Sequence, residues 1–135
     1  MKFTYTGIRV TDLDRSTKFY TEVMGMEIVH KGRMRAGGTY VLLKGTGSPQ
    51  RLELNFYPKD NIHYEPYREG SELDHLAFWV GDVDATYANL LKKGAKKAIK
   101  PFTEGRYRLA FAKDPDSIWI ELIGLLKKPA KKKQR

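Results

Sequence analysis

Hydrophobic and polar residues alternate along two runs of the chain, residues 3–10 and residues 73–80, which lie 70 positions apart. The apolar side carries Ile8 and Val10 in the first run, and Leu76, Phe78 and Val80 in the second. Because successive side chains of a strand point to opposite faces, this pattern predicts two half-buried strands. Two equivalent strands at this distance indicate an internal repeat.

The segment after each strand supports the repeat, since VTDLD at 10–14 is matched by VGDVD at 80–84. Both segments are followed by apolar residues at helical spacing. The first helix carries Leu13, Phe19, Tyr20, Val23 and Met24, and the second carries Val83, Tyr87, Leu90 and Leu91. Each half therefore continues from a strand into an amphipathic helix.

The ends of both helices are marked in the same way. Asp12 and Asp82 precede the helices, where a carboxylate accepts hydrogen bonds from the unpaired N–H groups of the first turn. Gly25 and Gly94 follow them and are typical of helix termination.

Three strand-like runs follow each helix. They are residues 26–30, 39–43 and 51–57 in the first half, and residues 97–101, 107–113 and 117–123 in the second. Gly45–Ser48 and Asp114–Asp116 have the composition of turns. Each half thus reads βαβββ. We expect an α+β fold in which two such modules form a cupped, barrel-like mixed sheet with the helices outside.

The module boundaries follow from these elements. We expect a single domain over residues 1–124, made of modules 1–57 and 73–124. Residues 58–72 are rich in charges and turn formers, so they are predicted to connect the modules. Residues 125–135 are predicted to be a basic, disordered tail.

Strand alternation places a second set of side chains on the cup face, opposite the helices. Tyr5 and His75 are offset by 70 residues and Glu53 and Glu121 by 68, so the repeat assigns each pair to equivalent strand positions. The same face is predicted to carry Arg9, Tyr57, Trp79 and Trp119. We expect two carboxylates and one imidazole to meet in the cup.

Such a group suggests a divalent cation, because a carboxylate on the cup face of a strand is costly to bury without a partner. The alternative is that the two glutamates form ordinary ion pairs with Arg9, Arg51 or Arg106, and that His75 is a satisfied, partly buried histidine. His30 and His63 have no repeat-related partner and are not predicted to be ligands.

Composition narrows the possible functions. The 135-residue chain has no cysteine, which excludes disulfides, thiolate metal sites and cysteine nucleophiles. The formal charge is +9, but the residues from Lys127 onward supply 6 of these charges and leave +3 for residues 1–126. We therefore expect no nucleic-acid partner. Neither a leader peptide nor a membrane span is predicted, and we expect a cytoplasmic protein.

The combined motifs are similar to those of the vicinal oxygen chelate superfamily, which includes glyoxalases, bleomycin-resistance proteins and extradiol dioxygenases. The resemblance is carried by IRVTDLDRSTKFYTEVMGM at 8–26, LEL at 52–54, LDHLAFWVGDVDA at 73–85 and KDPDSIWIEL at 113–122. Within the superfamily the arrangement most resembles glyoxalase I, whose metal takes one ligand from the first and one from the last strand of each module.

Carried over to this chain, the four ligand positions fall on Tyr5, Glu53, His75 and Glu121. Tyr5 departs from the pattern, because glyoxalase I has a histidine there. Arg9 matches an arginine that helps to hold the glutathione carboxylates, whereas Tyr57 stands where that family has an asparagine. With one imidazole lost, the resemblance implies an oxygen-rich site for Ni, Zn, Mn, Fe or Co.

The resemblance implies a metal-dependent lyase acting on a small substrate that chelates the ion through adjacent oxygens. The reaction would pass through an enediolate, with Glu121 or Glu53 moving the proton. Arg9 and Arg106 are candidates for holding an anionic tail. A homodimer is also expected.

Two alternatives stay open. One is a metal-free small-molecule-binding protein of the bleomycin-resistance type, with Trp79, Trp119, Tyr5 and Tyr57 as aromatic walls. The two tryptophans would instead pack at an interface between modules or subunits if they do not bind a ligand. The other alternative is an extradiol-type dioxygenase, although no second histidine is placed for its iron site.

Overall fold

A computed structural model describes residues 5–34, 37–69, 73 and 75–127 of the chain. In it the chain folds into two βαβββ units. The first unit contains β1 (Thr6–Arg9), α1 (Leu13–Lys18), the π-helical turn η1 (Phe19–Val23), β2 (Glu27–Arg33), β3 (Thr39–Lys44) and β4 (Arg51–Phe56). The second contains β5 (Leu76–Trp79), α2 (Val83–Lys92), β6 (Lys96–Glu104), β7 (Tyr107–Lys113) and β8 (Trp119–Leu125). The predicted α+β class and the repeat are confirmed.

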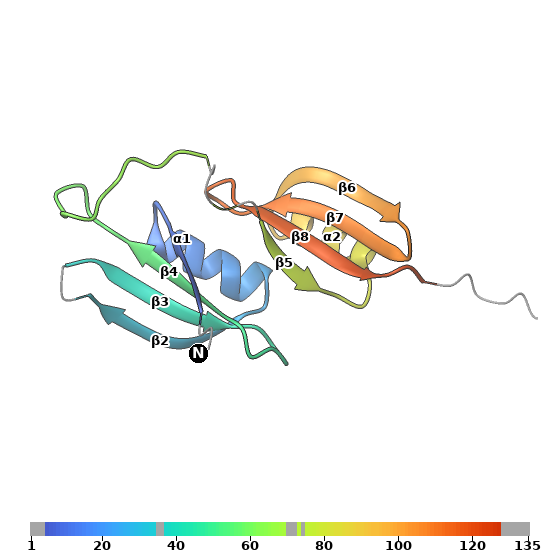
Figure 1. Cartoon of the computed structure of the whole chain (residues 1–135), viewed down its shortest axis with the longest axis horizontal. Helices are drawn as coiled ribbons and strands as arrows, with labels where there is room; N and C mark the ends of the chain where they lie inside the picture. Colours follow the sequence, from blue (N-terminus) through green and yellow to red (C-terminus); the bar gives the residue numbers. More distant parts are fainter. Residues whose placement is uncertain (1–4, 35–36, 70–72, 74, 128–135) are drawn as a thin grey trace, which may run out of the picture.

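Each unit forms its own four-stranded mixed sheet. The strand orders are β1-β4-β3-β2 and β5-β8-β7-β6, so the two sheets have the same topology. In both, the first strand pairs parallel with the last, and the other pairs are antiparallel. Figure 1 shows the two sheets side by side, each with its helix on the far face. The opposite face of each sheet, called the cup face below, is not covered by any helix among the described residues.

The helix caps form as the sequence predicts. The Asp12 carboxylate accepts a hydrogen bond from the backbone N–H of Arg15 at 2.9 Å, and Asp82 accepts one from Ala85 at 3.1 Å. Gly25 and Gly94 follow the helices with φ of 71° and 106°, a conformation that costs glycine least.

The helix-facing side chains of both units are buried in one apolar cluster. In the first sheet they include Val41, Leu43, Leu52 and Leu54. In the second they include Ala110, Ala112, Ile120 and Leu122. Burial of these positions fixes the register, since a shift by one residue would turn every one of them to the cup face.

Several strand ends differ from the prediction, and β2, for example, continues to Arg33 instead of ending at His30. β6 continues to Glu104 instead of ending at Pro101, and it does so through a register shift between Ile99 and Phe102. Proline has no N–H for the ladder, so it is tolerated at such an irregularity in an edge strand. β8 continues to Leu125, one residue into the segment predicted to be a tail. From residue 128 on, that tail lies outside the described residues, as do residues 3 and 4 of the first predicted strand.

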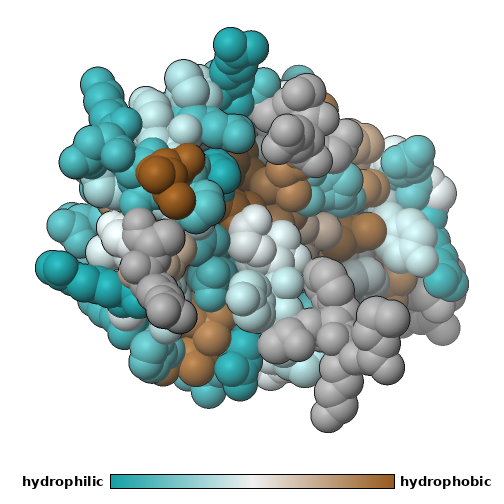
Figure 2. All heavy atoms as spheres, turned by 60° about the vertical axis from the view of Figure 1, so that its left-hand side comes forward, coloured by the Kyte–Doolittle hydropathy of each residue, from teal (hydrophilic) through white to brown (hydrophobic). Residues whose placement is uncertain are grey.

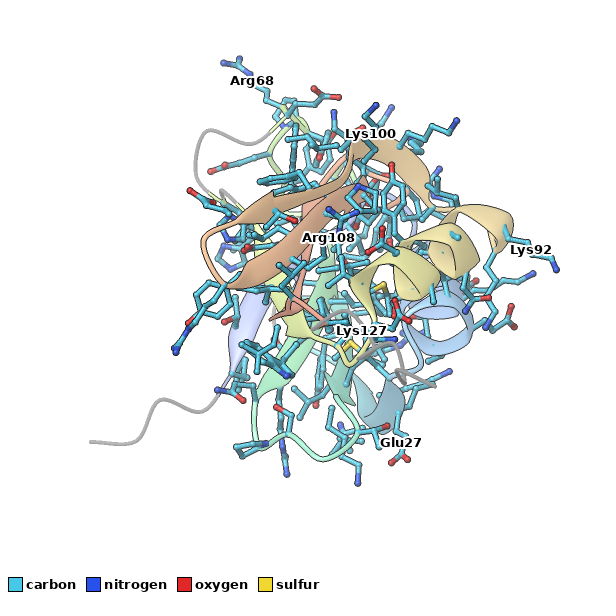
Figure 3. All side chains as sticks on the ribbon, turned by 90° about the vertical axis from the view of Figure 1, so that its right-hand side faces the viewer. Glu27, Arg68, Lys92, Lys100, Arg108 and Lys127 are labelled. Atoms are coloured by element: carbon cyan, nitrogen blue, oxygen red, sulfur yellow. The ribbon has the colours of Figure 1, made fainter. Side chains whose placement is uncertain are left out.

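Three arginine and lysine contacts show how the second unit is held together. Arg108 on β7 contacts Asp84 of α2 through two nitrogens, at 2.6 and 2.8 Å, and Lys127 pairs with the capping Asp82. Figure 3 shows Lys92 and Lys100 projecting outward from this unit. These contacts connect the helix to the strands from the solvent side, where each ion pair adds little stability.

The turn between β7 and β8 joins the second unit to the first. The Asp116 carboxylate accepts hydrogen bonds from the Thr11 hydroxyl and backbone N–H, and it forms a 2.9 Å ion pair with Arg15. The neighbouring Asp114 accepts a 3.0 Å hydrogen bond from Tyr20 on η1. These contacts cross about 100 residues of sequence and set the two units against each other.

Burial shifts the proton equilibria at this junction. It raises the pKa of Asp114, although hydrogen bonds from Ile118, Tyr20 and Asp116 oppose the shift. It also raises the pKa of Tyr20 well above its ordinary value, helped by the charge of Asp114. Tyr20 therefore remains a neutral hydrogen-bond donor at ordinary pH.

Within the described residues, no helix is both long and apolar enough to cross a membrane.

Candidate active site

A histidine and a glutamate lie together on the cup face of the second sheet. The Nε2 atom of His75 is 2.8 Å from the Oε2 atom of Glu121. The Glu121 side chain is 12% exposed and the His75 side chain 36%, so the carboxylate is held within the sheet surface and the imidazole is open to solvent. An imidazole and a carboxylate in this arrangement are suitable donors for a divalent cation.

Glu53 occupies the corresponding position on the cup face of the first sheet. It pairs in register with Gly7 of β1 and Leu42 of β3, and its side chain is half-buried. Within the described part of the chain, no arginine, lysine or histidine lies at ion-pair distance from Glu53. The structure therefore does not show an ion pair between Glu53 and Arg9 or Arg51, the alternative considered from the sequence.

Tyr5 directly precedes β1 and is 45% exposed. It is on the same end of the first sheet as Arg51 and Leu52, because Thr6 pairs with Leu52. Its phenol is accessible, but a neutral phenol is a weaker metal donor than the imidazole expected from the resemblance.

The four predicted positions do not form one group within a single chain. No set of three histidine and carboxylate side chains capable of holding a metal occurs among the described residues. The structure joins His75 to Glu121 and keeps Glu53 on the neighbouring sheet, since the sheets lie side by side and do not close face to face (Figure 1).

Arg9 is held by the end of β4 and by the segment that connects the two units. Its Nη1 atom donates a 2.5 Å hydrogen bond to the carbonyl of His63, and its guanidinium lies 4.8 Å from the centre of the Tyr57 ring. The His63 ring in turn contacts Tyr57 edge-on at 5.9 Å. The arginine is thus oriented on an aromatic face, with its other N–H groups available to a ligand.

A cleft of about 1270 Å³ opens beside Arg9. Its walls come from the ends of β1 and β4, from the connecting segment and from the turn before β8, and they include Tyr57, Tyr64, Arg68 and Trp119. Figure 2, in which the left-hand side of Figure 1 is turned forward, shows hydrophobic residues exposed among hydrophilic ones on that face of the molecule. The lining carries Arg9, Lys59 and Arg68 against Glu65 and Glu69, so its cations outnumber its carboxylates and, with the aromatic rings, suit an anionic organic ligand.

Three further predicted residues lie on the second sheet. Trp79 is 64% exposed and contacts Tyr107 edge-on, and Arg106 donates a 2.9 Å hydrogen bond to the Tyr107 hydroxyl. Trp119 packs edge-on against Phe111 and is covered by Lys113. Trp79 and Trp119 therefore belong to an open aromatic cup face, whereas Arg106 is at its rim.

One polar pair on the cup face of the first sheet is absent from the sequence prediction. The hydroxyl of Tyr40 lies 2.9 Å from the Nδ1 atom of His30. Alternation along β3 would have placed Tyr40 on this face, because its neighbours Val41 and Leu43 face the core. The pairing with His30 could not be read from the sequence, since it depends on a register shift in β2.

Comparison with known proteins gives a consistent result. Residues 2–122 match the family described as the glyoxalase/bleomycin resistance protein/dioxygenase superfamily. A probable lactoylglutathione lyase of Vibrio parahaemolyticus is 34% identical over 88% of this chain and 87% of its own length. The lactoylglutathione lyase of Haemophilus influenzae is 30% identical over 91% of this chain and 92% of its own length.

Solved structures agree with these relatives. Glyoxalase I of Zea mays has a TM-score of 0.75 at 32% identity, covering 93% of this chain, which spans 45% of the length of the maize chain. A trypanothione-dependent glyoxalase I of Leishmania major has a TM-score of 0.70 at 33% identity, covering 92% of this chain and 86% of its own. The repeated units and the paired His75 and Glu121 are consistent with this match, which extends over most of the chain. The chain belongs to the glyoxalase/bleomycin resistance protein/dioxygenase superfamily.

Proposed function

We propose that this protein is a metal-dependent lyase of the glyoxalase I type, which acts on the thiol adduct of a small 2-oxoaldehyde. The observation that carries the proposal is the His75–Glu121 pair on an open cup face, with Glu53 at the repeat-related position of the other sheet. It is supported by relatives named lactoylglutathione lyase, which are 30–34% identical over 88–91% of the chain.

The donor set fits a divalent cation. His75 and Glu121 lie in contact, with 2.8 Å between Nε2 and Oε2. Glu53 is a half-buried carboxylate with no cationic partner among the described residues. A half-buried carboxylate is stabilised when such a cation approaches it. Glu53, His75 and Glu121 would hold the ion, with Tyr5 at the fourth position. A bound Ni, Zn, Mn, Fe or Co ion would supply Lewis acidity that polarises the substrate carbonyl.

The complete site requires two copies of the chain. We infer a homodimer in which His75 and Glu121 of one subunit face Glu53 of the partner subunit. Two observations favour this arrangement: three ligands do not meet within the described part of one chain, and the cup face of the second sheet exposes large apolar side chains. Trp79 is 64% exposed and Leu125 is 57% exposed on the second sheet, as expected of a surface that another subunit covers.

The two glutamates differ in their freedom to move a proton. Glu121 is held by His75, whereas Glu53 has no such partner among the described residues. Glu53 is therefore the carboxylate that we assign as the base. It would remove the proton from the carbon that bears the thioether sulfur and the hydroxyl group, and return it to the neighbouring carbon. The hydroxyl proton passes to the oxygen of that neighbouring carbon, and the first carbon becomes the carbonyl carbon of a thioester. No redox partner is needed, because the same proton and electron pair are redistributed within the substrate.

Arg9 and the cleft beside it would receive the anionic part of the thiol cofactor. The guanidinium is fixed by the Tyr57 ring and the His63 carbonyl, so little conformational entropy is lost on binding. Tyr57 and Trp119 would contact the organic portion, and Arg106 lies on the other unit at the rim of its cup face.

Neither alternative has equal support. A Streptomyces glyoxalase/bleomycin resistance protein is 24% identical, so its TM-score of 0.66 supports the fold alone. A dioxygenase-type site would need a second histidine beside His75. Of the other two histidines, His30 contacts Tyr40 and His63 lies in the connecting segment.

Metal content and turnover test the proposal together. The purified protein should contain one of the five metals in near-stoichiometric amount, and His75→Ala and Glu53→Gln should reduce it. His63→Gln is the matched control and should keep the metal. The protein should convert methylglyoxal in the presence of a thiol, with glutathione as the first thiol to try. A protein that takes up none of these metals would contradict the proposed mechanism.

A further inference from the structure

His30 and Tyr40 form a hydrogen-bonded pair on the first sheet that has no part in the site described above. The Tyr40 hydroxyl is 2.9 Å from His30 Nδ1, and the two rings stack with centres 5.6 Å apart and an angle of 26° between their planes. His30 is exposed and Tyr40 is half-buried, so a ligand on this face can reach the pair.

The pair lies on the same face as Glu53. In the cross-strand register His30 pairs with Leu42, and Leu42 pairs with Glu53, so these three residues form one row across β2, β3 and β4. Tyr40 pairs with Asn55 in the next row, which makes it a diagonal neighbour of Glu53. Diagonal neighbours in a sheet lie about 7–8 Å apart, a distance that a small ligand and a tyrosine side chain bridge.

Gly32 makes room for this arrangement. A Cβ atom at Gly32 would lie 2.8 Å from the Tyr40 hydroxyl oxygen and 2.9 Å from two ring carbons. The tyrosine ring therefore lies directly over the glycine of the edge strand. Any larger residue at position 32 would push the Tyr40 ring away from His30, so the His30–Tyr40 contact requires glycine there.

The pair presents a hydrogen-bond donor to the cup. When the Tyr40 hydroxyl donates to Nδ1, the imidazole proton is on Nε2 and is free to donate to a ligand. When Nδ1 donates to Tyr40, the hydroxyl proton is free instead. Both tautomers leave one N–H or O–H group available, and the nearest neighbour in the row, Leu42, is apolar. A ligand oxygen at this point would accept a hydrogen bond from the pair, whereas a methyl group would accept none.

We propose that His30 and Tyr40 form a specificity subsite for an oxygen-bearing substituent of the substrate, such as a hydroxymethyl or carboxylate group. This inference rests on the proposed function, because it assumes that the reacting carbons lie at Glu53. The substituent then extends from β4 across Leu42 toward β2. The protein discriminates in favour of 2-oxoaldehydes whose substituent accepts a hydrogen bond, because an analogue without the oxygen displaces water from the pair and makes no hydrogen bond in return.

Paired substrates test the subsite directly. Methylglyoxal and its hydroxymethyl analogue, hydroxypyruvaldehyde, differ by one hydroxyl group, and both form adducts with the same thiol. We expect kcat/KM to favour the hydroxymethyl substrate by about 5-fold, roughly the net value of one hydrogen bond. Tyr40→Phe and His30→Gln should each bring this ratio close to one. Tyr87→Phe removes a phenol from α2, away from the cup face, and should keep the ratio.

The outcomes separate a specificity role from a purely structural one. If the variants lose both substrates equally, or if the wild-type protein has no preference, the pair only stabilises the edge strand and the inference is wrong. Because His30 is exposed, His30→Gln should fold even if Tyr40→Phe does not.

A binding measurement separates this inference from the proposed function. If neither aldehyde is turned over, the proposed lyase activity fails, but the subsite can still be examined by titrating the isotope-labelled protein with glycerate and lactate. These acids also differ by one hydroxyl group. The His30 ring signals should shift at a several-fold lower concentration of glycerate, and Tyr40→Phe should abolish the difference. Equal responses, or no response at His30, would overturn the inference.

Discussion

Removal of the Asp116 carboxylate should loosen the junction between the two βαβββ units. This side chain is 3% exposed, and it accepts hydrogen bonds from the Thr11 hydroxyl and from the Thr11 N–H at 3.2 Å. It also pairs with Arg15 at 2.9 Å, and a 3.4 Å contact with Ser16 is too long to add much. The substitution Asp116→Ala deletes all of these acceptors at once.

The expected loss of stability is about 2–3 kcal/mol. Thr11 itself is exposed, but both of its hydrogen bonds end on a charged carboxylate that is 3% exposed, so each contributes roughly 1–1.5 kcal/mol. Arg15 adds little to this sum because its side chain is half exposed and can turn to water. Asp116→Asn keeps one oxygen acceptor and should therefore cost less than Asp116→Ala.

Urea unfolding at neutral pH measures the effect. With a slope of about 2 kcal/mol/M, the midpoint should fall by about 1–1.5 M for Asp116→Ala. Asp84→Ala is the matched control, since it removes a carboxylate whose ion pair with Arg108 lies on the surface. If Asp116→Ala shifts the midpoint no more than Asp84→Ala, the turn at residues 114–116 does not hold the units together as we infer.

Three further outcomes are expected. The pKa of Tyr20 is raised above its ordinary value of 10.0, so its contribution to stability is complete below pH 10 and is lost as the pH rises above it. Thermal unfolding between pH 8 and 11 should therefore show a steeper loss for the wild-type protein than for Tyr20→Phe, and parallel curves would contradict this. Asp12→Ala should cost about 1 kcal/mol through loss of the helix cap, whereas Asp14→Ala, within the helix, should cost clearly less in the same unfolding assay. Removal of metal with a chelator should lower the melting temperature of the wild-type protein but not that of His75→Ala, and added metal should restore it. Equal melting temperatures of the wild-type protein with and without chelator would argue against a metal site at His75.

The sequence was sufficient to predict most of the fold. Alternation in the strands and helical spacing after Asp12 and Asp82 are local signals, and both are repeated, so each half supports the assignment of the other. The same signals placed Glu53 and Glu121 on the faces opposite the core, as the burial of Leu54 and Leu122 requires.

The arrangement of the two sheets could not be predicted in the same way. An alternating strand shows which face packs on the helix, but it does not show whether the opposite, cup face meets the other unit or another chain. For this reason the expected meeting of Glu53 with His75 and Glu121 is not found within one chain. The His30–Tyr40 contact was also beyond reach, since it depends on the irregular pairing near Ile28.

Subunit complementation tests the central claim, a metal site shared between two copies of the chain. Glu53→Gln and Glu121→Gln should each inactivate the enzyme as a homodimer. After the two variants are unfolded together and refolded in equal amounts, about half of the dimers are mixed, and each mixed dimer has one intact site out of two. We expect about a quarter of the wild-type activity and metal content to return. No recovery in verified mixed dimers would contradict the shared site.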